Sequence, residues 1–152
     1  MREESATGAG PVPVYAHILR LGFDEDLRSS LERYVANHQL TAGFVITAVG
    51  SLRQAVLRFA DQSGGTTLSG KYEIVSLVGT LSTTGAHLPV VLSDAHGQTI
   101  GGHHLRGCEV YTTVELVIGV VVEPRFDRET DPQTGFRELV IHDVEAASNE
   151  YP

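Results

Sequence analysis

Hydrophobic and polar residues follow two different spacings along this chain. In "FDEDLRSSLERYVANHQL", residues 23–40, apolar positions recur every three to four residues, which is the spacing of one helical face. The residues on that face are Leu27, Leu31, Tyr34 and Val35. Asp24 precedes them as a candidate N-cap, acidic residues follow it where the first turn is expected, and His38 lies near the end. The pattern predicts one amphipathic helix.

Elsewhere, short apolar segments alternate with turn residues, which is typical of strands. The expected strands cover residues 14–21, 43–51, 55–61, 71–81, 87–93, 99–105, 108–123 and 137–145, with a polar connection over 126–136. One helix among many strands at hairpin spacing predicts an α+β domain built on a mostly antiparallel sheet.

The strand expected over 108–123 has two chemically different faces. The first face is apolar and is expected in the core; it carries Val110, Val114, Leu116, Ile118, Val120 and Val122. The second face mixes aromatic, hydroxyl and carboxylate groups; it carries Tyr111, Thr113, Glu115 and Val117. Such a surface is either solvated or covered by another subunit, so Tyr111 and Glu115 are candidate contact residues between subunits.

Length and composition indicate a single domain. The chain has 152 residues, 41% of them hydrophobic, which is enough for one core. We expect the domain to cover 14–145, flanked by an N-terminal tail over 1–13 and a C-terminal tail over 146–152. The longest apolar run, 116–122, is too short for a membrane helix, and no signal peptide is visible, so a cytoplasmic protein without membrane contact is expected. Cys108, the single cysteine, excludes an internal disulfide and is expected to be a small buried residue.

The charge balance disfavours direct binding to nucleic acid. Nineteen acidic residues against eleven basic ones give a net charge of -8, and Lys71 is the single lysine. The arginines are scattered rather than clustered, so no segment matches a phosphate backbone. No phosphate-binding loop, nucleophile elbow, zinc-protease helix or cysteine pair is present either, and a non-catalytic role is therefore favoured over an enzyme.

Several segments, in this order and spacing, resemble one known family. They are "ILRLGFDEDLRSSLERYV", "AGFVITAVGSLRQAVLRFAD", "GKYEIVSLVGTLS", "HLPVVLSDAHGQTIGGHHLRG", "VYTTVELVI" and "TGFREL". Together they are similar to the plants-and-prokaryotes-conserved domain, which plant nuclear proteins carry after an AT-hook and which many prokaryotes make as a freestanding protein. The resemblance implies an α+β fold, assembly as a homotrimer and a family label of DNA binding. The Arg-Gly-Arg-Pro core of the AT-hook is absent from this chain.

The resemblance also draws attention to the histidines. Freestanding prokaryotic members carry His-Leu-His followed by Gly-Gly-His, and the matching positions here are His87, Pro89 and His103. Independently, "SDAHGQT" predicts a hairpin loop at 95–97 with Gly97 in the left-handed conformation.

This hairpin fixes an expected register. It pairs Pro89 with His103 and His87 with Leu105, so His87 and His103 share one face while His104 points to the other. Two imidazoles at this spacing are candidate zinc ligands, with water, a ligand or a neighbouring subunit completing the coordination.

Three functions therefore remain open from the sequence. The first is a homotrimeric, non-catalytic regulatory protein of a family labelled as DNA-binding. The second is a zinc-binding protein or metal-dependent enzyme that uses His87 and His103. The third is a sensor that binds a small ligand in a cleft between subunits.

Overall fold

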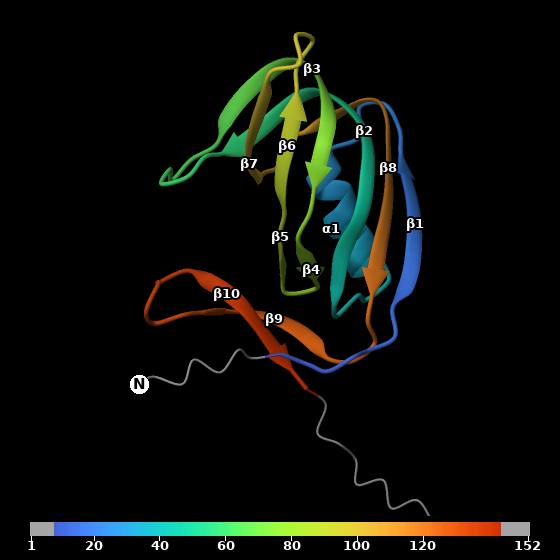
Figure 1. The fold of residues 1–152 in the computed structure, drawn as a ribbon, viewed down its shortest axis with the longest axis vertical. Coiled ribbons are helices and arrows are strands. Elements are labelled where there is room, and N and C mark those ends of the chain that lie inside the picture. The colour runs from blue at the N-terminus through green and yellow to red at the C-terminus, as the bar shows by residue number, and fades with distance from the viewer. Residues whose placement is uncertain (1–7, 144–152) are drawn as a thin grey trace, which may run out of the picture.

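The computed structural model describes residues 8–143, which form one α-helix and ten β-strands (Figure 1). In chain order they are β1 (Tyr15–Leu21), α1 (Leu27–Asn37), β2 (Gly43–Arg58), β3 (Thr66–Leu77), β4 (Thr80–Ser82), β5 (Gly85–His87), β6 (Pro89–Ser93), β7 (Thr99–His104), β8 (Glu109–Val120), β9 (Arg125–Thr130) and β10 (Arg137–His142). All strand pairings in this part of the chain are antiparallel. The predicted α+β fold with a mostly antiparallel sheet and one helix is confirmed.

Strand β2 organises the main sheet. The strand order is β1-β8-β2-β3-β6-β7, and β7 also pairs with the end of β2, so the strands β2, β3, β6 and β7 close on themselves. The short strand β4 extends from β2 and pairs with β5. The hairpin β9–β10 is a separate two-stranded sheet. It lies beside β4 and β5 (Figure 1). Arg128 Nη2 of β9 donates to Thr80 Oγ1 of β4 at 2.5 Å.

The helix begins two residues later than the sequence suggested. Asp26 is the N-cap, since its carboxylate accepts from Ser29 N at 2.7 Å and also from Gly107 N at 2.6 Å. The prediction of Asp24 as the cap was wrong. Asp24 N donates to Val110 O and Val110 N donates to Glu25 O, so residues 24–26 extend the sheet and cannot start the helix. The first turn consequently holds no acidic residue, while His38 does occupy the C-cap.

The core lies between α1 and one face of the sheet. Leu27, Leu31 and Val35 of the helix are buried against the inward residues of β1, β2 and β8, and Cys108 is buried with them as expected. The inward parity predicted for β8 is confirmed from Val110 to Val120. It is wrong for Val122, whose side chain is 69% exposed because the strand has already ended. In Figure 1, α1 lies behind β2 and β8, and no helix or strand of residues 8–143 lies over the opposite face of these strands.

Four of the expected strands are joined or divided in the structure. The strand predicted over 87–93 is divided at Leu88 into β5, which already begins at Gly85, and β6. The strands predicted over 43–51 and 55–61 are one continuous strand, β2, whose β-bulges allow it to bend while it pairs with β8 and β3. The strand predicted over 71–81 is divided into β3 and β4 at Gly79. Gly79 has φ +124°, and a Cβ there would lie 1.9 Å from His87 O, so only glycine permits this approach.

The polar connection predicted over 126–136 was also wrong. Residues 125–130 form β9, which pairs with β10 in the register Phe126 to Ile141 and Arg128 to Leu139. Polar side chains dominate this segment, and its ladder is made by the backbone, so hydrophobic periodicity did not indicate it. The last strand was expected and is present as β10.

The expected tails fall largely beyond the described residues. Residues 8–13 contain no helix or strand and their side chains are exposed, whereas 1–7 and the C-terminal tail 146–152 lie outside the described part. Within residues 8–143, no helix combines the length and the apolar character needed to cross a membrane.

Candidate functional site

His87 and His103 meet face to face where β5 and β7 end. Their ring centroids lie 4.8 Å apart with an interplanar angle of 22°. The predicted hairpin explains the position of His103: Asp94 N donates to Gln98 O, Gly97 has φ +78°, and Pro89 pairs with His103. The register that places His103 opposite Pro89 was therefore predictable from local sequence.

On the N-terminal side of Pro89, the strand pairing differs from the predicted register. His87 belongs to β5 and pairs with Thr80 of β4, not with Leu105. Leu88 interrupts the strand, and its carbonyl accepts from His104 N at 3.0 Å. Because Gly79 approaches the His87 carbonyl so closely, the backbone of His87 is held against β4 while its ring stacks on His103.

The adjacent glycines allow β7 to approach β2. A Cβ at Gly102 would lie 3.0 Å from Arg58 O and 3.2 Å from Leu57 Cβ. Gly102 therefore lies in close contact with the backbone of β2. The contact brings Arg58 into register with His103.

His104 points into the core, as the register predicted. Its side chain is 1% exposed, and neither ring nitrogen has a hydrogen-bond partner among the described residues. Burial, together with the Arg28 guanidinium, lowers the pKa of His104 to about 4, although Asp26 and Glu32 act in the opposite direction. His104 is therefore a neutral imidazole at neutral pH.

A cleft of about 560 Å³ opens beside the stacked histidines. Its lining residues come from α1, β2, β5, β7 and the β9–β10 hairpin, and they include Arg58, Arg128, Phe136, Arg137 and Glu138. Burial and then Arg128 lower the pKa of His87, and burial and then Arg58 lower the pKa of His103. The cleft therefore combines two imidazoles that favour the neutral state with several permanent positive charges.

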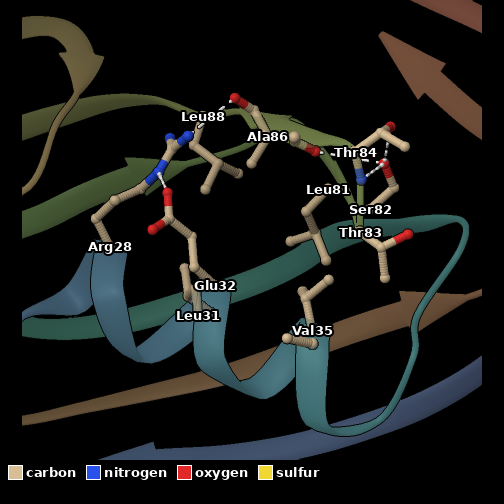
Figure 2. Close-up of a pocket in the computed structure, with 12 residues that line it drawn as sticks. Arg28, Leu31, Glu32, Val35, Leu81, Ser82, Thr83, Thr84, Ala86 and Leu88 are labelled. Carbon is tan, nitrogen blue, oxygen red and sulfur yellow. Dashed lines mark hydrogen bonds and ion pairs between the residues drawn. The ribbon is translucent and has the colours of Figure 1, made fainter.

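A smaller pocket of about 280 Å³ lies between α1 and the strands β4 and β5 (Figure 2). Leu31, Val35 and Leu81 form its apolar part, while Arg28 and Glu32 form an ion pair of 2.7 Å at one end. Arg28 Nη2 donates to Ala86 O at 3.2 Å, so this arginine connects the helix to β5, whose residues line both hollows.

The sequence profile of the Plants and Prokaryotes Conserved (PCC) domain matches residues 12–122 of this chain. The chain belongs to the PCC domain family. The matched span contains His87 and His103, and it ends before the hairpin β9–β10 that contributes Arg128 and Arg137 to the cleft.

Two curated relatives place the PCC domain in longer proteins. Bifunctional protein GlmU of Synechococcus sp. (strain JA-2-3B'a(2-13)) is 48% identical over 135 residues, which cover 89% of this chain and 21% of that protein. AT-hook motif nuclear-localized protein 10 of Arabidopsis thaliana is 31% identical over 138 residues, which cover 84% of this chain and 37% of that protein. The chain thus spans about a fifth to about a third of these relatives.

Solved structures of similar chains share the fold. A hypothetical protein from Salmonella enterica is 38% identical with a TM-score of 0.86, covering 88% of this chain and 97% of that chain. A protein from Archaeoglobus fulgidus described as metal-containing is 26% identical with a TM-score of 0.76, covering 88% and 99%. A candidate DNA-binding protein from Bacteroides thetaiotaomicron, 18% identical with a TM-score of 0.72 and covering 82% and 91%, is similar in fold alone.

Tyr111 and Glu115 of the PCC domain lie on the sheet face that α1 leaves uncovered. Glu115 is exposed and pairs in register with Arg20 of β1 and Val49 of β2. The Lys71 ammonium lies 4.3 Å from the centre of the Tyr111 ring. Both residues occupy the surface that the sequence predicted, and their role in assembly stays a prediction.

A second group of ligand-type side chains lies on the hairpin. One potential ligand atom each from Asp127, Glu129 and His142 lies within 4.8 Å of the others. Arg125 Nη2 lies 3.1 Å from Asp127 Oδ2, so this carboxylate already has a cationic partner. This group was not predicted from the sequence, because residues 126–136 were expected to form a connection. The alternation of Asp127 and Glu129 in a strand was the available signal.

Proposed function

We propose that this PCC-domain protein is a homotrimeric, non-catalytic regulatory protein that binds a small ligand in the cleft beside His87 and His103. The observation that carries the proposal is the cleft itself. Its volume of about 560 Å³ lies within the range of small-molecule sites, and it brings polar groups from six elements to one place. In this proposal the PCC domain holds the residues of the cleft in place, and binding of a ligand in the cleft controls the regulatory activity of the protein.

A non-catalytic role is consistent with the state of the single thiol. Cys108 is buried, and burial raises its pKa to about 11, so it remains a protonated thiol at neutral pH. Its sulfur accepts from Val56 N at 3.2 Å, which ties it to the core.

The uncovered sheet face supports assembly. Ile18 and Val49 are 82% and 54% exposed on β1 and β2, the two strands that pair with β8 beside Glu115. A group of exposed apolar side chains with charged neighbours is typical of a protein contact surface. The resemblance to freestanding family members favours three copies, with Tyr111 and Glu115 at the contact.

Light scattering tests the assembly. We expect about three times the 16.4 kDa chain mass, and a lower mass for Ile18→Asp, which places a charge in the contact. Ala95→Asp, at the exposed tip of the β6–β7 hairpin, is the matched control and should remain trimeric. A monomeric wild-type protein at micromolar concentration would exclude the trimer.

Ligand-observed NMR tests the cleft. A set of neutral, cationic and anionic fragments should contain compounds that bind the wild-type protein and lose binding in His103→Ala. Fragments that bind both proteins equally well would place the ligand site elsewhere.

Zinc binding by His87 and His103 is the second candidate. It is favoured by the stacking of the two rings at 4.8 Å, and the Archaeoglobus relative is described as metal-containing. Pro89 stands opposite His103 and offers no ligand, so a zinc ion would need further ligands from water, a bound molecule or another subunit.

Elemental analysis of untagged protein tests this candidate. Zinc should be retained in His104→Leu and lost in His103→Ala. Zinc that persists in His103→Ala and disappears in His142→Ala would instead place the metal on Asp127, Glu129 and His142.

We do not extend the proposal to direct binding of duplex DNA. The chain has a net charge of -8, and two of its exposed arginines are already paired with carboxylates. Arg53 lies 2.8 Å from Glu109, and Arg106 lies 2.6 Å from Glu32. A regulatory role involving DNA would then require a partner that binds it.

A further inference from the structure

Within residues 8–143, most arginines without an acidic partner line one cleft. Among the described residues, five arginines form ion pairs with carboxylates: Arg28, Arg33, Arg53, Arg106 and Arg125. The other described arginines are Arg20, Arg58, Arg128 and Arg137, and the last three of these line the histidine cleft. In a chain with a net charge of -8, this concentration of unpaired positive charge marks a distinct surface.

Neutral oxygen atoms hold these three guanidinium groups in position. Arg58 Nη1 donates to Gln62 O at 3.3 Å, and Arg128 Nη2 donates to Thr80 Oγ1. Arg137 Nη2 donates to Arg128 O at 2.7 Å. Each guanidinium has five N–H donors, so each keeps further donors for a bound group.

The electrostatics of the cleft favour an anion. Glu138 is the one acidic residue among the described lining residues. Arg28 also lines the cleft, but Glu32 already pairs with it, so the three unpaired arginines against one carboxylate leave an excess of two positive charges. Burial lowers the pKa of Arg128, and Arg137 adds to this effect while Glu138 opposes it. Crowded cations in a partly buried site repel one another, and a bound anion relieves that repulsion.

We propose that the cleft binds a small phosphate monoester, whose phosphate group is held by Arg58, Arg128 and Arg137. This inference rests on the proposed ligand-binding function and adds the chemical class of the ligand. A phosphate monoester carries about -1.5 to -2 charges at neutral pH and three acceptor oxygens, which match the excess charge and the three arginines. The stacked imidazoles and Phe136 then contact the organic part of the ligand, for which the volume of the cleft leaves room.

One part of the proposed phosphate site lies within the span matched by the PCC profile, and the other part lies beyond it. Arg58 and both histidines lie within the span matched by the PCC profile, residues 12–122. Arg128, Phe136 and Arg137 lie on the hairpin beyond that span. The hairpin therefore completes the anion site.

Calorimetric titration with phenyl phosphate at constant ionic strength tests the inference. The wild-type protein should bind, and Arg128→Gln and Arg58→Gln should each weaken binding about tenfold or more, because each loses a charge-assisted interaction. Arg125→Gln is the matched control on the same hairpin; its partner is Asp127 and it does not line the cleft, so its affinity should change by less than about twofold.

Control measurements distinguish misfolding of a variant from loss of the binding site, and phosphate recognition from binding of any anion. Thermal unfolding and light scattering of each variant establish that a loss of affinity does not come from misfolding; since Arg128 contacts Thr80, Arg58→Gln provides a second, independent substitution. Binding of inorganic phosphate and of sodium benzoate shows whether phosphate or any anion is recognised. Benzoate binding as strong as that of phenyl phosphate would overturn the phosphate assignment.

The experiments also distinguish a failure of the phosphate inference from a failure of the proposed ligand-binding function. If phenyl phosphate does not bind but neutral fragments bind and lose binding in His103→Ala, the anion inference is wrong and the ligand-binding function stands. If no fragment of any class depends on His103, both are wrong.

Discussion

Replacing His104 with leucine should make the stability of this protein less sensitive to mild acid. The imidazole is 1% exposed and its pKa is about 4 in the folded chain, against 6.5 for an unperturbed histidine. Between these two values, the unfolded chain binds a proton that the folded chain does not. The folded state is therefore favoured fully above about pH 6.5, and this contribution is lost as the pH falls toward 4.

The size of the effect follows from the two pKa values. A difference of one pKa unit corresponds to about 1.4 kcal/mol, so the full effect of His104 is about 3 kcal/mol and the part between pH 7 and pH 5 is about 2 kcal/mol. Leucine has no titrating group and fills a similar volume. It also removes two buried ring nitrogens that have no hydrogen-bond partner among the described residues, so His104→Leu should be at least as stable as wild type at pH 7.

Urea unfolding of wild type and His104→Leu at pH 7 and pH 5 measures how much unfolding free energy each protein loses. All samples need the same protein concentration, because assembly would contribute to stability. His87, His103 and the carboxylates titrate in both proteins, so their effects cancel in the comparison. The unfolding free energy of the wild type should fall by about 2 kcal/mol more than that of His104→Leu. An equal loss in both proteins would refute the assignment of His104 as a buried neutral residue.

Three other substitutions or measurements test the fold and its surface. Gly79→Ala should lower the free energy of unfolding by at least about 1–3 kcal/mol in urea titrations, since its Cβ would meet His87 O and the backbone there has positive φ; an unchanged value would contradict that close approach. Asp26→Ala should cost about 0.5–2 kcal/mol at pH 7 through loss of the helix cap. Although burial raises the pKa of Asp26, hydrogen bonds from Ser29 and Gly107 lower it below 3.8, so the difference from wild type should shrink as the pH falls below about 4. Fluorescence anisotropy with duplex DNA at physiological salt should give no binding tighter than about 10⁻⁴ M, and strong binding with a steep salt dependence would reveal a basic surface formed by assembly.

The sequence by itself determined the features that depend on neighbouring residues. The single helix followed from apolar spacing, and the core face of β8 followed from alternation. The hairpin around Gly97 fixed the register that places Pro89 opposite His103, and with it the opposite directions of His103 and His104. These features are local, because a turn type and a two-residue period propagate only along adjacent strands.

The tertiary structure alone decided which distant groups meet. The cap moved from Asp24 to Asp26 because residues 24–26 bond to the start of β8, more than eighty residues away. Arg58, Arg128 and Arg137 are scattered in the sequence, and they come together because β2 reaches β7 and the polar hairpin β9–β10 packs beside β4. Hydrophobic periodicity carries no information on such contacts, since they are made by backbone ladders and long polar side chains whose partners lie far along the chain.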